Sequence, residues 1–243
     1  MQVPGNITVV AVHGAWADGS SWKDVILGIE REGIRILAAP IPLTSLNDDI
    51  AALKRALARV KGPVILAGHA YAGAVIASVN DERVKALVYI AALAPDEGET
   101  VAQVFYRDEP HAKAPQLAPD EDGFIWMPHE GFRNAFAQHA TAEQIALSAA
   151  VQRPIAVKCI QEPAPTPAWR SKPSWYLIAE EDRMINPKTQ HFMAKRMGAK
   201  TRSLAVDHAP LLSAPHTVVD IIMDAQGYPL KGRFELPADK QKL

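Results

Sequence analysis

The segment from Val64 to Asn80 constrains the fold of this chain more than any other. The apolar run Val64-Ile65-Leu66-Ala67 has the length of a buried strand, and Gly68-His69-Ala70-Tyr71-Ala72-Gly73 follows it directly. Helical patterning continues to Asn80. Glycine permits the sharp backbone turn that such a close junction needs. The segment therefore predicts a strand, a tight turn and a helix.

The rest of the chain repeats this alternation. Five further apolar runs have the length and β-branched content of buried parallel strands: 7–12, 34–38, 84–91, 175–179 and 201–206. Amphipathic stretches lie between most of them: 22–31, 46–60, 187–197 and 215–225. We expect Ser20 or Ser21 to cap the first helix and Ser45 the second. This order predicts an α/β fold, a doubly wound and mostly parallel sheet that binds ligands at the carboxyl ends of its strands.

The alternation stops between about Pro95 and Pro173. Prolines are frequent there, and the helical patterns of residues 130–139 and 141–151 have no clear strands between them. A structureless loop of this length is uncommon in a compact domain. We therefore predict a core formed by residues 1–94 and 173–229, a helical cap inserted at 95–172, and a C-terminal tail at 230–243.

Composition narrows the ligand class. With 48% hydrophobic residues in 243, the chain can bury a large core as one domain. Its 26 Lys and Arg balance 27 Asp and Glu without a basic run, which argues against nucleic acid or an anionic membrane and favours a small neutral ligand. We expect no signal peptide and no membrane span. The single cysteine, Cys159, indicates a reducing cytoplasm, with secretion without disulfides as the alternative. Assembly into a homo-oligomer also stays open.

The turn at 68–73 matches a nucleophile elbow, a G-x-S-x-G motif, with Ala70 where serine would stand. A methyl group cannot attack a carbonyl. His13-Gly14-Ala15-Trp16 follows the first strand, where a backbone N–H contributes to an oxyanion hole. We therefore predict that the N–H groups of Ala15 and Tyr71 form such a hole beside Ala70.

An acid and a base follow in the expected chain order. Asp182 stands between a strand and a helix, and His208 follows the last strand. The predicted roles are an orienting acid for Asp182 and a general base for His208. Alternatives remain: Asp182 as a mere helix cap, with Glu180, Glu181 and Asp96 as competing acids, and His208 as a structural histidine.

Five side chains are candidates for a substrate pocket: Trp16, His69, Phe105, Trp126 and Trp169. The cap aromatics among them could equally pack the cap on the core, and we expect the His69 side chain to point into the packed elbow. The other histidines show no paired ligand spacing, so we expect no metal site, and the residues imply no cofactor.

Taken together, these segments resemble bacterial α/β-hydrolases related to plant methylesterases and hydroxynitrile lyases. The segments that carry the resemblance are 13–22, 42–45, 68–73, 91–99, 168–170, 173–176 and 181–222. The resemblance implies an α/β-hydrolase fold and chemistry on carbonyl compounds, without a particular substrate. The pattern of the related proteins at the elbow is Gly-His-Ser-Tyr-Gly-Gly, from which this chain departs at Ala70 and Ala72.

Two origins of Ala70 stay open, a residue native to the chain and an engineered replacement of serine. The departure at Ala72, which no inactivating change requires, favours the native origin. The leading functional prediction is an enzyme that acts on a small ester or lactone through His208, Asp182 and the backbone donors. The alternatives are a lyase or isomerase that needs no serine, and a non-catalytic small-molecule binder.

Overall fold

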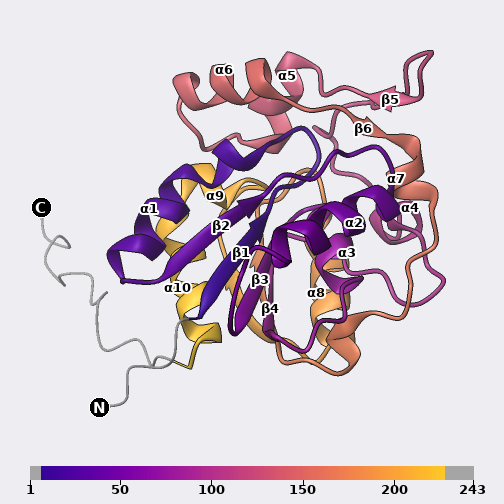
Figure 1. The fold of residues 1–243 in the computed structure, drawn as a ribbon. Coiled ribbons are helices and arrows are strands. Elements are labelled where there is room, and N and C mark those ends of the chain that lie inside the picture. Colours follow the sequence, from indigo (N-terminus) through magenta and orange to yellow (C-terminus); the bar gives the residue numbers. More distant parts are fainter. Residues whose placement is uncertain (1–6, 228–243) are drawn as a thin grey trace, which may run out of the picture.

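A computed structural model describes residues 7–227 of the chain (Figure 1). Its main sheet has six parallel strands in the order β2-β1-β3-β4-β7-β8. Their bounds are β1 Thr8–Val12, β2 Arg35–Ala39, β3 Val64–His69, β4 Val84–Ile90, β7 Ser174–Ala179 and β8 Lys200–Leu204. The predicted doubly wound, mostly parallel sheet is confirmed. The predicted tail at 230–243 lies outside the described residues.

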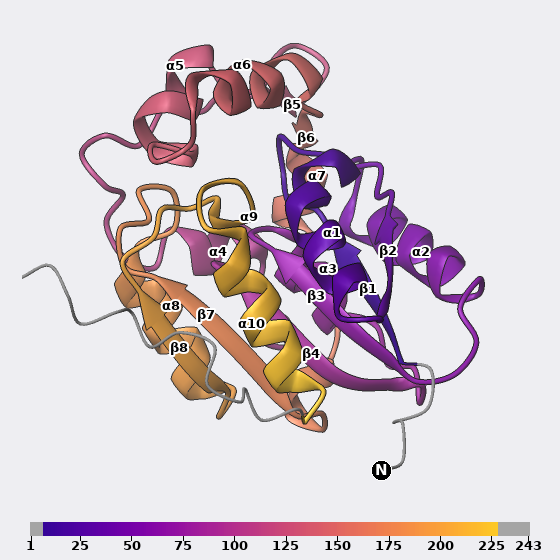
Figure 2. The same cartoon turned by 90° about the vertical axis from the view of Figure 1, so that its left-hand side faces the viewer.

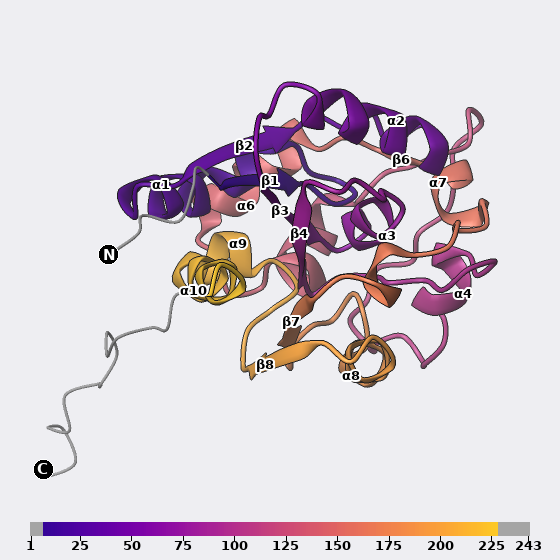
Figure 3. The same ribbon diagram turned by 60° about the horizontal axis from the view of Figure 1, so that its bottom comes forward.

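Helices cover both faces of this sheet (Figure 3). On one face lie α1 (Lys23–Arg31) and α10 (Pro215–Ala225), and on the other lie α2 (Leu46–Leu57), α3 (Ala72–Ala77) and α8 (Pro187–Arg196). Successive strand residues alternate between the two layers, so that Val9 packs in the α1 and α10 layer and Val10 in the layer of α2 and α3. Among residues 7–227, no helix has the length and apolar character needed to span a bilayer.

The helix caps were predicted with mixed success. The Ser45 hydroxyl accepts the N–H of Asp48 at 3.0 Å and caps α2 as expected. Neither Ser20 nor Ser21 caps α1. The chain enters that helix through a 3-10 turn, η1 (Gly19–Trp22), so the first unpaired N–H groups occur earlier, and Asp18 accepts the N–H of Ser20 at 2.8 Å.

Residues 95–172 contain short elements, of which α5 and α6 lie over the carboxyl ends of the strands (Figure 2). The elements are α4 Val101–Phe105, β5 Phe124–Ile125, α5 His129–Gly131, η2 Phe132–Phe136, α6 Ala142–Val151, β6 Ile155–Ala156, α7 Val157–Gln161 and η3 Ala168–Arg170. Besides these helices and turns, the segment contains the short strands β5 and β6, which pair antiparallel and were not expected from the sequence. Strands of two residues are too short to show a period of two. We refer to residues 95–172 as the cap.

Candidate active site

The turn between β3 and α3 is held by hydrogen bonds on both sides of Ala70. Its N–H donates to the carbonyl of Ile90 at 3.2 Å, and its carbonyl accepts the N–H groups of Leu93 at 2.9 Å and Gly73 at 3.1 Å. Ala70 adopts a φ of +50°, in the left-handed region that favours glycine. The elbow backbone is therefore present with a methyl group at its tip.

Two glycines make this turn possible. A Cβ at Gly68 would lie 2.9 Å from the carbonyl oxygen of Ala72, and one at Gly73 would lie 2.3 Å from that of Leu93. The Ala72 side chain, by contrast, is accommodated and fully buried at the start of α3. The crowding of the turn thus falls on Gly68 and Gly73, and alanine at position 72 does not distort the elbow.

Strained backbone gathers at this edge of the sheet. Trp16, Ala70 and Ala91 follow the neighbouring strands β1, β3 and β4, and have φ values of +56°, +50° and +42°. A non-glycine residue in this region costs about 1–2 kcal/mol, and such residues concentrate at functional sites. The carboxyl ends of the central strands are therefore where a site is expected.

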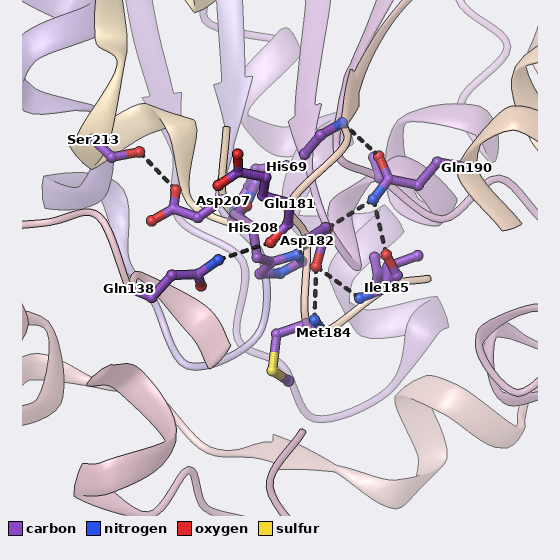
Figure 4. Close-up of polar contacts among 12 residues, drawn as sticks. His69, Gln138, Glu181, Asp182, Met184, Ile185, Gln190, Asp207, His208 and Ser213 are labelled. Atoms are coloured by element: carbon purple, nitrogen blue, oxygen red, sulfur yellow. Dashed lines mark hydrogen bonds and ion pairs between the residues drawn. The ribbon is translucent and has the colours of Figure 1, made fainter. Parts of the chain in front are cut away.

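His208 and Asp182 meet in the structure. His208 Nδ1 lies 2.8 Å from Asp182 Oδ2, and both side chains are buried (Figure 4). The Gln190 amide donates to the same carboxylate oxygen at 2.7 Å, while the N–H groups of Met184 and Ile185 donate to Oδ1 at 2.7 and 2.9 Å. Four donors thus hold the carboxylate in one orientation. Because Nδ1 donates to Asp182, the neutral ring carries its lone pair on Nε2.

The alternatives for the acid are not supported by the contacts. Asn186, not Asp182, caps α8, accepting the N–H of Lys188 at 3.0 Å. The three competing carboxylates pair elsewhere: Glu180 with His191 and Ser203, Glu181 with His139, and Asp96 with Arg170. Asp182 is the carboxylate that contacts His208.

His69 supports the backbone of His208 and does not line the cavity above Ala70. Burial lowers the pKa of His69 to about 3, so that the ring is neutral, and its Nε2–H donates to the His208 carbonyl at 2.7 Å. The ring lies beside a second cavity instead. The assignment of His69 to the substrate pocket is wrong, because the residue before an elbow points back into the packed layer.

The two predicted oxyanion donors are available. Within the part of the chain that the structure describes, neither the N–H of Ala15 nor that of Tyr71 donates to a protein acceptor. The loop after β1 is fixed to the cap by Trp16, whose N–H donates to the Arg153 carbonyl at 3.0 Å. Ala15, Ala70, Tyr71 and His208 line one cavity.

A buried carboxylate that the sequence analysis missed lies behind Tyr71. The Tyr71 hydroxyl donates to Asp49 Oδ2 at 2.7 Å, the N–H of Leu43 donates to Oδ1 at 2.7 Å, and the Cys159 thiol lies 3.6 Å from Oδ2. Asp49 has no exposed surface, and burial raises its pKa to about 6. Burial also raises the pKa of Tyr71 well above its ordinary value. The sequence shows Asp49 only as one acidic residue in the first turn of α2.

The cavity above Ala70 is largely apolar. Trp16 and Phe105 line it as predicted, with Leu93, Val101, Ala102, Tyr106, Leu117, Ile125, Ile155, Ile160, Met184 and Ile185. Trp16 also donates its indole N–H to the Ile125 carbonyl of β5 at 2.9 Å, which joins the core loop to the cap. Among these residues and the four named above, His208 and the two tyrosines are the only ones whose side chains contain an ionisable group.

Two predicted pocket aromatics lie elsewhere. Trp126 follows Ile125 in the chain, and since strand residues alternate in direction, Ile125 faces the cavity and Trp126 is half exposed, bonded to Asp120 at 3.1 Å. Trp169 is buried away from the cavity, with the Arg196 guanidinium 5.7 Å from its ring. The assignment of Trp126 and Trp169 to the pocket is therefore wrong.

Comparison with known proteins agrees with this architecture. Residues 9–221 match the sequence profile of the alpha/beta hydrolase family. The chain belongs to this family. The α/β hydrolase is 26% identical to the alpha/beta hydrolase nvfD of Aspergillus novofumigatus, over 90% of this chain and 96% of that protein. It is 28% identical to a carbendazim hydrolyzing esterase of a Nocardioides species, over 45% of this chain and 50% of that protein.

A solved structure shows the same fold. The crystal structure of polyneuridine aldehyde esterase superposes on this α/β hydrolase with a TM-score of 0.80, covering 91% of this chain and 99% of that one at 17% identity. The homologues and structural neighbours of this α/β hydrolase are esterase-like.

Proposed function

We propose that this α/β hydrolase acts on a small, neutral carbonyl compound of the ester or lactone class, bound above Ala70. One observation carries the proposal: the His208–Asp182 pair and two unpaired backbone N–H groups open onto the same apolar cavity. In this pose the carbonyl oxygen accepts hydrogen bonds from Ala15 and Tyr71. The esterase names of the relatives support the same class of substrate.

Because Ala70 has no nucleophilic atom, a water molecule supplies the attacking oxygen. His208 Nε2 takes a proton from this water as its oxygen bonds to the carbonyl carbon, and the resulting oxyanion is stabilised by the two N–H groups. The bond to the leaving oxygen then breaks, and His208 returns the proton to that oxygen. Asp182 keeps the imidazole oriented throughout. Hydrolases without their nucleophile retain about 10³- to 10⁴-fold catalysis over water, so turnover is slow.

The cavity walls favour uncharged substrates. Aliphatic and aromatic side chains surround Ala70, and among residues 7–227 no Lys, Arg, Asp or Glu lines this cavity. Moving an ion from water into such surroundings without a partner is strongly unfavourable. Acyl groups with short aliphatic or aromatic chains therefore fit better than those with a carboxylate or an amine.

Ala70 itself favours a second candidate. With the nucleophile absent and the base in place, proton abstraction beside a carbonyl by a lyase or isomerase needs the same His208 and the same anion hole. A non-catalytic binder would need only the cavity.

The test is a panel of p-nitrophenyl esters of short acyl chains. We expect slow release of p-nitrophenol by the unaltered chain, loss of that rate in His208→Ala, and a much faster rate in Ala70→Ser. Activity in Ala70→Ser alone, with tight ester binding by the unaltered chain, would favour the binder. A folded Ala70→Ser that hydrolyses none of the esters would overturn the proposal.

A further inference from the structure

The cap binds both neighbours of Asp182. The Gln138 amide donates to the Glu181 carbonyl at 2.7 Å (Figure 4), and the Arg183 guanidinium donates to the Asn134 carbonyl at 2.9 Å. His139 adds an ion pair to the Glu181 carboxylate at 3.0 Å. The loop that carries the acid is thus attached to the cap on both sides of Asp182.

The cap also binds the neighbour of His208. Asp207, directly before His208, is fully buried, and its carboxylate accepts the His139 N–H at 2.8 Å. It also accepts the Ser213 hydroxyl at 2.6 Å (Figure 4). A buried carboxylate needs such donors, and hydrogen bonds to an ionised group are stronger than neutral ones. One of the two partners of Asp207 therefore comes from the cap.

The same short segment contacts the imidazole itself. The Phe136 ring packs edge-on against the His208 ring, with centroids 5.1 Å apart, and against His69 at 6.2 Å. Phe136 ends the π-turn η2, in which the Ala137 N–H donates to the Phe132 carbonyl at 2.8 Å. Turns of this kind occur often at functional sites.

We infer that Phe136, Gln138 and His139, together named the cap clamp, act with Asp207 as positioning residues that hold His208 against Asp182. The inference rests on the proposed function only where it gives His208 the role of base. The ion pair of His139 with Glu181 is half exposed and contributes little. The buried Asp207 and the amide of Gln138 carry most of the effect. The orientation of the acid–base pair consequently depends on contacts that the cap supplies.

The test uses proton NMR of the unaltered chain without substrate, observing the low-field resonance of the proton between His208 Nδ1 and Asp182. We compare Gln138→Ala and Asp207→Asn with Glu162→Ala. The control removes a cap–core contact on the opposite side, where Glu162 accepts the N–H of Asn47 at 3.1 Å. Gln138 is only half buried, so Gln138→Ala keeps the inference testable should Asp207→Asn unfold.

We expect the resonance to broaden and its exchange with water to accelerate about tenfold or more in Gln138→Ala and Asp207→Asn, and to stay unchanged in Glu162→Ala. Equal exchange in all of these proteins, with unchanged melting temperatures, would overturn the inference. If no ester turns over but the resonance responds as expected, the clamp stands and the proposed function fails.

Discussion

Replacing Asp49 by asparagine tests how much the buried carboxylate behind Tyr71 costs the folded protein in free energy. Asp49 is fully buried, and burial raises its pKa to about 6 from an ordinary value of 3.8. A tenfold change in proton affinity is worth about 1.36 kcal/mol, so the difference between 6 and 3.8 corresponds to about 3 kcal/mol. The ionised carboxylate is therefore a cost to folding at neutral pH, and asparagine removes it.

The sign of the pH dependence follows from the raised pKa. Between about pH 6 and pH 4 the folded chain binds a proton at Asp49 that the unfolded chain does not, so lowering the pH stabilises the fold through this group. The unaltered chain should gain about 2–3 kcal/mol relative to Asp49→Asn between about pH 8 and pH 4. Urea unfolding of both proteins across this range measures the difference.

The adjacent Asp48 provides the control. A hydrogen bond from Ser45 lowers the pKa of this exposed carboxyl, so the unaltered chain should lose stability relative to Asp48→Asn as the pH falls. Opposite slopes for the two neighbouring variants are expected. A stability of the unaltered chain relative to Asp49→Asn that stays constant with pH, or that falls as the pH is lowered, would refute the reasoning.

Three further predictions follow from the contacts. Tyr71→Phe removes a donor from the buried Asp49 and should lower the free energy of unfolding by about 1–3 kcal/mol, measured by urea titration. Gly73→Ala should destabilise by about 3 kcal/mol or prevent folding, since its Cβ would meet the Leu93 carbonyl at 2.3 Å; a melting temperature equal to that of the unaltered chain would contradict this. Phe105 lines the cavity, so adding Phe105→Ala to Ala70→Ser should raise the KM for p-nitrophenyl butyrate about tenfold. The Trp126 side chain is half exposed, so adding Trp126→Ala instead should leave that KM within about twofold.

The fold could be predicted because its signals are local. The central strands β1 and β3 are largely apolar and fully buried, and the close contacts at Gly68 and Gly73 leave no room for a side chain in the turn around Ala70. The meeting of Asp182 with His208 follows from the order of strands whose carboxyl ends share one edge. Their catalytic roles stay predictions.

The surroundings of Trp126, Asp49 and Asp207 could not be predicted, because they depend on contacts between residues that are distant in the sequence. Trp126 directly follows β5, and β5 is held by its ladder with β6, whose residues lie about thirty positions apart in the chain. The buried Asp49 contacts Tyr71 and Cys159, and the buried Asp207 accepts the His139 N–H of the cap, all of them residues distant in the sequence. Neither carboxylate differs from a surface carboxylate in the sequence.

The central claim is that the cavity above Ala70 binds an ester carbonyl within reach of His208. Rapid mixing of p-nitrophenyl butyrate with Ala70→Ser measures this most directly, because serine at the elbow converts binding into an acyl-enzyme. The account predicts a burst of p-nitrophenol equal in amount to the enzyme, and no burst when His208→Ala is added to Ala70→Ser. A folded Ala70→Ser without a burst, or a burst that survives the loss of His208, would contradict it.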